Sequence, residues 1–158
     1  MLGTGVSTYE PMPDMVALEY GTQAAGYDLP VHAKISGLAP GNPLDALERG
    51  NPWTRFHVYF LDSSGTCDAT TTCTVPADCF GGQCLTPVNP GHCGSRIGYV
   101  SSGSDYVLGH SLAMAFQNGL TQSDLQGKQV LVTVEVEDSA GHYAMDQKTV
   151  TLIAPSSN

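Results

Sequence analysis

The strongest pattern of hydrophobic and polar positions lies near the C-terminus, in Gln129–Glu137. Every second residue there is a valine, and the last two intervening positions are glutamates. A period of two is typical of a strand with one face in the core and the other in water. Turn-forming residues follow in Asp138–His142, where Gly141 can adopt a positive φ. Alternation then returns in Lys148–Ile153, so the two segments predict an antiparallel hairpin.

Further strand-like segments lie upstream, separated by Asn-Pro and Pro-Gly pairs that interrupt regular structure. They are Met15–Tyr20, Leu29–Ser36, Trp53–Phe60, Arg96–Ser101 and Tyr106–Phe116. The last of these also fits helical spacing, but its alternation favours a strand. Helical structure is expected only as single turns in Leu44–Arg49 and in Thr121–Leu125, the second ended by Gly127.

Many short strands, frequent turns and little helix predict an all-β fold, an antiparallel β-sandwich. The 158 residues are the size of a single domain. We expect an N-terminal arm over residues 1–13, a sandwich domain over 14–154 and a short tail over 155–158. Within the domain, residues 62–94 are expected to form a cysteine-rich insertion between two strands.

The C-terminal hairpin also resembles part of a known class of domain. The valine run, the turn at Asp138–Gly141 and the alternation in Thr149–Leu152 resemble the last two strands of bacterial immunoglobulin-like domains, of the PKD and fibronectin type III kind. Trp53, placed before Phe56–Phe60, suits the central strand of such a domain. The resemblance implies an immunoglobulin-like sandwich. It also implies a role as an adhesion module, a spacer or an assembly subunit of a cell-surface structure.

All five cysteines lie in one segment that is poor in core-forming residues. They are Cys67, Cys73, Cys79, Cys84 and Cys93. Such a segment is usually held by cross-links, and disulfides persist in oxidising compartments. We expect two disulfides and one remaining thiol, and the sequence leaves the pairing open. The stretch Ala77–Cys84 looks like the small cysteine-rich insertions of exported bacterial proteins.

A metal or redox site is the alternative for the same segment. Cys79, Cys84, Cys93 and His92 could supply four zinc ligands. Zinc sites usually show two close pairs of ligands separated by a longer spacer, and this segment has no repeated short pair. A small redox protein that uses reduced thiols in Cys67–Cys93 stays open as a further alternative.

The charge balance narrows the range of partners. There are 15 acidic residues against 6 lysines and arginines, which gives a net charge of −9. Such a surface repels phosphate groups, so nucleic acid is not expected as a partner. No stretch approaches the ~20 apolar residues of a membrane span. We expect an extracellular, cell-surface or periplasmic location, with any leader outside this sequence because its start lacks the basic and apolar regions of a signal peptide.

Carboxylates are the candidate ligands for a calcium ion. Calcium takes several carboxylate and carbonyl oxygens, often at the ends of loops. The candidates flank the insertion or end the valine strand, and they are Asp62, Asp68, Asp78, Glu135, Glu137 and Asp138. No Asp-x-Asp-x-Asp-Gly loop is present, so solvated acids are the simpler interpretation.

No convergent set of residues predicts catalysis. Gly109–Ala113 resembles the nucleophile elbow of lipases, but Ala113 stands where that tight turn needs a second glycine. We expect the chain to have no enzymatic activity. A small hydrolase that uses His110 and Ser111 stays open as a rival hypothesis. The histidines lie on five separate segments, with no pair at metal-binding spacing: His32, His57, His92, His110 and His142.

The N-terminal arm and the residues directly after it are rich in large apolar side chains, among them Tyr9, Met12 and Met15. Such an arm can pack on its own domain or dock on a neighbouring subunit as an added strand. The leading hypothesis is a non-catalytic extracellular structural or binding subunit, which assembles with copies of itself or with a surface complex or filament. The alternative is a carbohydrate- or ligand-binding module. Its exposed aromatic platform would come from Trp53, Tyr59, Tyr99, Tyr106 or Tyr143.

Overall fold

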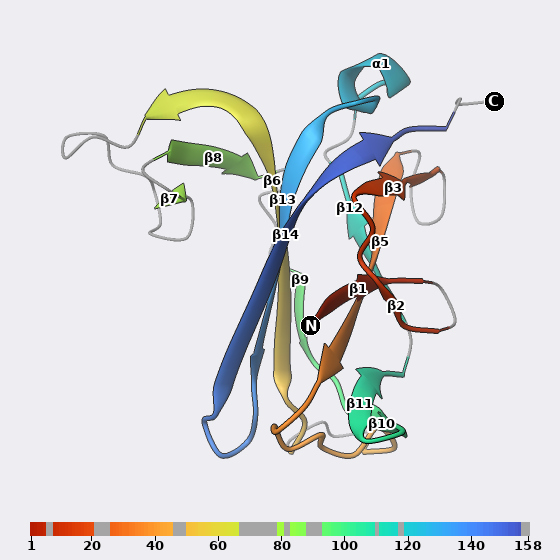
Figure 1. Cartoon of the computed structure of the whole chain (residues 1–158), viewed down its shortest axis with the longest axis vertical. Coiled ribbons are helices and arrows are strands. Elements are labelled where there is room, and N and C mark those ends of the chain that lie inside the picture. The colour runs from red at the N-terminus through yellow and green to blue at the C-terminus, as the bar shows by residue number, and fades with distance from the viewer. Residues whose placement is uncertain are drawn as a thin grey trace.

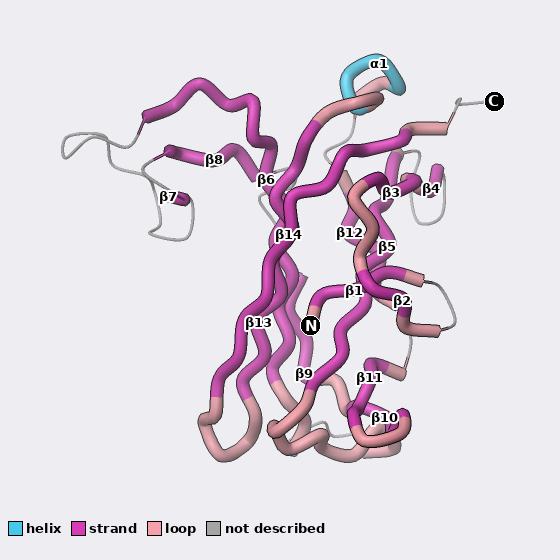
Figure 2. The backbone as a smooth tube through the Cα atoms, viewed as in Figure 1, coloured by secondary structure: helices cyan, strands magenta, loops and turns pink. Residues whose placement is uncertain are grey.

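The structure, a computed structural model, describes residues 1–5, 8–20, 26–45, 50–66, 79–80, 83–87, 93–109, 111–116 and 119–155. For residues 62–66, 79–80, 83–87 and 93–94 it describes the backbone alone. This part of the chain is mostly β, with two seven-stranded sheets and one short helix, α1 (Gln122–Leu125) (Figure 1, Figure 2). The expectation of an all-β fold built from antiparallel sheets is confirmed.

The first sheet is organised by β5 (Tyr27–Ile35), because four other strands of the described chain pair with it, all antiparallel. Asp28 is paired with Glu19 on one strand and with Ala115 on another, so β5 is covered along both edges. The other members are β1 (Leu2–Thr4), β2 (Glu10–Pro11), β4 (Glu19–Tyr20), β10 (Tyr99–Ser102), β11 (Asp105–Leu108) and β12 (Leu112–Ala115).

The second sheet is built on three long strands, β6 (Trp53–Thr66), β13 (Gln129–Glu137) and β14 (Tyr143–Ile153). β13 lies between the other two and is antiparallel to both, and Figure 1 shows the three strands running down to the β13–β14 turn at the bottom of the view. The shorter members are β3 (Met15–Ala17), which is parallel to β14, and β7 (Cys79–Phe80), β8 (Gln83–Pro87) and β9 (Cys93–Arg96).

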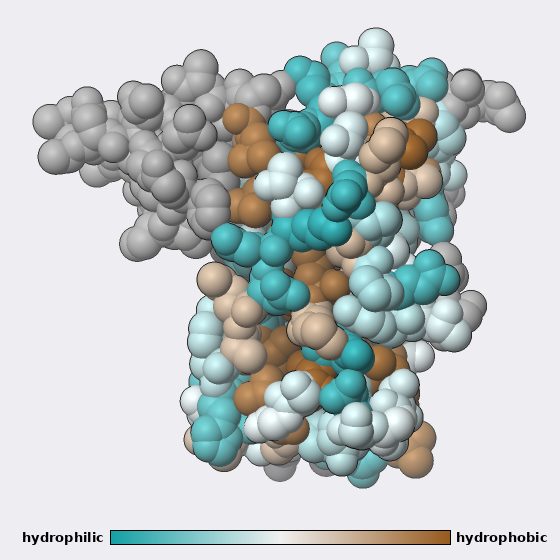
Figure 3. All heavy atoms as spheres, viewed as in Figure 1, coloured by the Kyte–Doolittle hydropathy of each residue, from teal (hydrophilic) through white to brown (hydrophobic). Residues whose placement is uncertain are grey.

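One hydrophobic core joins the two sheets. Its buried members alternate along β5, β6 and β13, as a pleated strand requires when one face is covered. They include Leu29, Val31, Ala33, Phe56, Val58, Val130, Val132, Val134 and Val136. Figure 3 shows hydrophobic residues along the middle of this face of the molecule, interrupted by hydrophilic ones. The valine alternation therefore marks the core face of β13.

The C-terminal hairpin predicted from the sequence is confirmed. β13 has the predicted bounds, and every residue from Gln129 to Glu137 has a partner on β14. β14 begins at Tyr143, five residues before the predicted start, so the hairpin is longer than expected. Gly141 adopts the expected positive φ, 84°, in the turn. The single helical turn after Thr121 is also present, as α1.

Several segments differ from their predictions. The predicted strand Met15–Tyr20 is divided into β3 and β4, and Arg96–Ser101 is divided between β9 and β10, with the two members of each pair in different sheets. The predicted strand Tyr106–Phe116 is two strands, β11 and β12, which pair with different parts of β5. Gly109 lies in the break between them. In the segment predicted as a helical turn from Leu44, residues 46–49 lie outside the described part, and Leu44 itself is exposed.

In the described ranges no helix has the length and the apolar composition that crossing a membrane requires.

Phe56 tests the assignment of the core. It is 0% exposed and is paired with Val134 at the centre of the second sheet. We expect Phe56→Ala to lower the free energy of unfolding by about 3–5 kcal/mol, because it removes apolar contacts and leaves a cavity. Chemical denaturation measures this. As a control, Gln147→Ala on the exposed face of β14 should change the value by less than about 0.5 kcal/mol. Equal effects of the two substitutions would contradict the assigned faces.

Candidate functional site

A row of four large side chains crosses the outer face of the second sheet. Trp53 on β6 is paired with Arg96 on β9 and with Glu137 on β13, and Glu137 is paired in turn with Tyr143 on β14. Directly paired residues place their side chains on the same face of a sheet. Tyr143, Glu137, Trp53 and Arg96 therefore form one row, which we name the Trp53 row.

The row faces away from the core. The residues next to it along β6 and β13 are Thr54 and Val136, and both are buried on the core side. The second row on the outer face contains Met145, Glu135 and Arg55, paired in the same way. We name the two rows together the Trp53 surface. Its residues are Trp53, Arg55, Arg96, Glu135, Glu137, Tyr143 and Met145.

Two arginines hold the indole ring in place. The guanidinium carbons of Arg55 and Arg96 each lie 5.6 Å from the centroid of the Trp53 ring. Such cation–π contacts are worth about 0.5–1 kcal/mol at exposed sites. Arg55 also forms an ion pair of 3.6 Å with Glu135, and Arg96 donates a hydrogen bond of 3.0 Å to the carbonyl oxygen of Asn51. Each guanidinium is thus oriented by a second contact.

The surface combines an open groove with exposed apolar groups. A groove of about 610 Å³ is lined by Trp53, Arg55, Arg96 and Glu137 and by the turn residues 138–141. Tyr143 and Met145, at the β14 margin, are each 56% exposed. Partial burial raises the pKa of the Tyr143 phenol, and the charge of Glu135 raises it further. The indole Nε1 of Trp53 is buried without a hydrogen-bond partner in the described part, so the surface offers the ring and not this donor.

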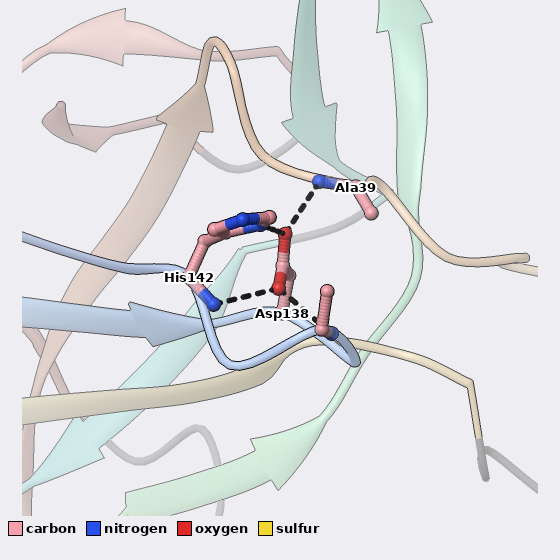
Figure 4. A network of polar contacts seen from close by, with 4 residues as sticks. Ala39, Asp138 and His142 are labelled. Carbon is pink, nitrogen blue, oxygen red and sulfur yellow. Dashed lines mark hydrogen bonds and ion pairs between the residues drawn. The ribbon is translucent and has the colours of Figure 1, made fainter.

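The turn beside the groove is fixed by the carboxylate of Asp138 (Figure 4). One oxygen, Oδ2, accepts a hydrogen bond of 3.1 Å from the backbone N–H of Ala39 and lies 3.0 Å from Nδ1 of His142. The other, Oδ1, accepts bonds of 2.9 Å from the backbone N–H groups of Ala140 and His142. The carboxylate thus ties the β13–β14 turn to the segment that follows β5. The N–H group of Ala39, together with His142 and Ala140, holds the pKa of Asp138 well below its usual range.

The candidate calcium ligands do not converge in the described part of the chain. Glu135 and Glu137 lie on the Trp53 surface, whereas Asp138 is buried and surrounded by N–H donors. Among the described residues there is no group of three or more histidines, cysteines and acids that could hold a metal. Of Asp62 only the backbone is described, and Asp68 and Asp78 lie outside the described residues.

The cysteine segment is described only where it is paired with other strands. The backbone pairing of β7 and β8 sets Cys79 opposite Cys84, and β9 sets Cys93 opposite Phe56 of β6. Cys67, Cys73 and His92 lie outside the described residues. The expected disulfides and the zinc alternative both stay predictions.

The N-terminal arm packs on its own chain. β1 and β2 pair with each other and, through β1, with β5, and Met12 is buried in the core. The ring of Tyr9 lies edge-on to His32 at 5.7 Å, and its hydroxyl donates to the carbonyl oxygen of Leu2. His32 is buried. Met15 is 58% exposed on β3, at the edge of the second sheet.

The other predicted aromatic and catalytic residues do not form a site in the described part. Tyr59 and Tyr99 are buried, and Tyr106 packs against the core. Gly109–Ala113 connects one strand to another, β11 to β12, whereas a nucleophile elbow connects a strand to a helix. Ser111 lies in that connection, and His110 is outside the described residues.

Comparisons with protein-family models, with curated proteins and with solved structures give no match to this chain.

Sequence reasoning identified Trp53 and Tyr143 as aromatic candidates and missed the two arginines beside Trp53. The position of Arg55 beside Trp53 could have been predicted from the sequence, because residues two apart on a strand share a face. The position of Arg96 could not have been predicted in this way, because its place opposite Trp53 depends on the register between β6 and β9.

The Asp138 network gives a pH-dependent prediction. A carboxylate whose pKa is lowered by folding stabilises the fold above the unfolded-state pKa, about 4, and this contribution is lost as the pH falls. We expect Asp138→Asn to lower the thermal unfolding temperature at pH 7, since Ala39 loses a charged acceptor. The difference from wild type should narrow below about pH 4. Differential scanning calorimetry across pH measures both effects, with exposed Glu10→Gln, away from the Trp53 surface, as the control. A difference that is absent at pH 7, or unchanged in acid, would contradict the role of Asp138.

Proposed function

We propose that this chain is a non-catalytic binding module that docks on a protein partner through the Trp53 surface. The observation that carries the proposal is the composition of this surface. A tryptophan, two arginines, a tyrosine and a methionine gather on one face of one sheet, around a groove of about 610 Å³. Tyrosine, tryptophan, methionine and arginine are the residues enriched in the cores of protein–protein interfaces.

The order within the surface supports the same function. Interface residues bind well when their side chains are held in place before the partner arrives, because less conformational entropy is then lost. Arg55 is held by Glu135 and by the Trp53 ring, and Arg96 by Asn51 and the same ring. The Asp138 network fixes the adjacent turn. A protein partner would therefore meet a surface that is already formed.

A carbohydrate-binding module is the second candidate, favoured by Trp53 and Tyr143 on the same row. Stacking of a sugar requires an open aromatic face. The ring of Trp53 is half-buried and is contacted by two guanidinium groups, so less of it is open to a sugar. The groove therefore supports a protein partner better than a sugar.

We also propose that the fold is an immunoglobulin-like sandwich that is exported to the cell surface or the periplasm. The shared core of the two sheets supports the sandwich arrangement, and the valine hairpin supports the immunoglobulin-like class. The five cysteines and the scarcity of lysine and arginine support an oxidising, extracellular location. A metal-binding or redox role for Cys67–Cys93 is the alternative, and the oxidation state of the cysteines distinguishes the two.

Photo-crosslinking tests the protein-binding surface. A photo-reactive amino acid in place of Met145 should give a covalent adduct with a protein from the secreted and envelope fractions of the cells that make the chain. The adduct should be lost when Arg96→Glu is added, because the charge beside Trp53 is reversed. The crosslinker in place of Val100, which is exposed on the first sheet, is the matched control and should give no such adduct.

Adducts that form equally from both positions, or that survive Arg96→Glu, would count against the Trp53 surface as the binding site. Binding to a glycan array that is abolished by Trp53→Ala would instead favour the carbohydrate alternative. Each variant is first checked for an unchanged unfolding temperature, so that loss of binding is not loss of fold.

Mass spectrometry of the unreduced protein tests the cysteine chemistry. We expect a mass lower by about 4 Da than that of the reduced chain, from two disulfides, and one thiol that reacts with an alkylating reagent. Four or five reactive thiols, or a mass increment that a chelator removes, would overturn the exported, disulfide-bonded assignment in favour of the metal or redox alternative.

A further inference from the structure

The charges of the Trp53 row are arranged with opposite signs on the two sides of the indole. Arg96 is the direct partner of Trp53 on β9, and Glu137 is its direct partner on β13. Neighbouring strands lie about 4.8 Å apart. The positive and the negative side chain are therefore at similar distances from Trp53, in opposite directions across the sheet.

This arrangement is complementary to itself under one kind of two-fold rotation. An axis that lies over Trp53 and runs parallel to the strands brings two copies face to face and exchanges the two sides of the row. Arg96 of one copy then faces Glu137 of the other, and the same pair forms again on the other side. An axis that runs across the strands would instead set Arg96 against Arg96, which like-charge repulsion disfavours.

We infer that the partner of the Trp53 surface is a second copy of this chain, docked about an axis parallel to the strands. The inference rests on the proposed function and names its partner. Two-fold interfaces use the same patch on both subunits, so a patch must be self-complementary to serve in one. The Trp53 row meets this requirement through Arg96 and Glu137.

The second row is compatible with the same docking. Arg55 lies on the strand of the axis and would approach its own copy, but its charge is already paired with Glu135 at 3.6 Å. The groove beside Trp53 lies next to the axis and would be filled by the second copy.

The chain as a whole carries a charge of −9, which favours separation of the copies. The attraction between the copies therefore has to come from the Arg96–Glu137 pairs across the axis, and the chain has few other positive side chains that could supply it.

Charge reversal tests the inference on the full chain. Sedimentation velocity and native mass spectrometry of the wild type, from low to high micromolar concentration, should show a monomer–dimer equilibrium. Arg96→Glu and Glu137→Arg should each weaken the dimer by about tenfold or more, because each creates two like-charge pairs across the axis. A mixture of the two variants should restore the dimer, because every pair across a mixed interface is again Arg opposite Glu.

The mixing experiment separates this interface from other causes. Glu10→Arg, on an exposed strand of the first sheet, changes the net charge as Glu137→Arg does and should leave the dimer unchanged. A wild type that stays monomeric throughout, or a mixture that does not regain the dimer, overturns the self-docking. If an adduct with a different protein still forms at Met145, the proposed binding function stands without it. If neither a dimer nor an adduct forms, the proposed function fails as well.

Discussion

The pleat of β6 and β13 is the constraint on which the rest of the structure depends. Because side chains alternate between the two faces of a strand, burying Phe56, Val58 and the β13 valines in the core forces the intervening residues outward. Trp53, Arg55, Glu135 and Glu137 are among the residues on this outer face. A register shift of one residue would exchange the two sets, so the same hydrophobic pattern that builds the core also presents the Trp53 surface.

The Asp138 network links that surface to the first sheet. Its carboxylate satisfies three backbone N–H groups, two in the β13–β14 turn and one, from Ala39, in the segment after β5. A buried carboxylate is costly unless it is well hydrogen-bonded. Here Oδ1 accepts from two backbone N–H groups, and Oδ2 accepts from one and lies 3.0 Å from Nδ1 of His142. The sequence pattern suggested a metal ligand at this position, because Asp138 follows two glutamates. In the structure it acts as a structural acceptor that orders the rim of the groove.

The sequence predicted the features that depend on neighbouring residues and missed those that depend on register. The valine alternation was enough for β13, and the turn composition was enough for Gly141 and the hairpin. The division of Tyr106–Phe116 into β11 and β12 arises from pairing with separate parts of β5, which no local pattern encodes. Arg96 reaches Trp53 for the same reason, through the pairing of β9 with β6.

The way in which the strand edges are covered decides what kind of assembly the chain can form. The edge of β14 is occupied near Leu152 by β3. Closer to the start of β14, Asp146 accepts a hydrogen bond from the backbone N–H of Leu2. Lys148 donates a hydrogen bond to the carbonyl oxygen of Met12 and forms an ion pair with Asp14. Charged groups at an edge oppose strand addition, which is the contact that extends sheets without limit. A face that is self-complementary about a two-fold axis instead closes on itself. Docking through the Trp53 surface would therefore produce a dimer, and a filament would need a second, different contact.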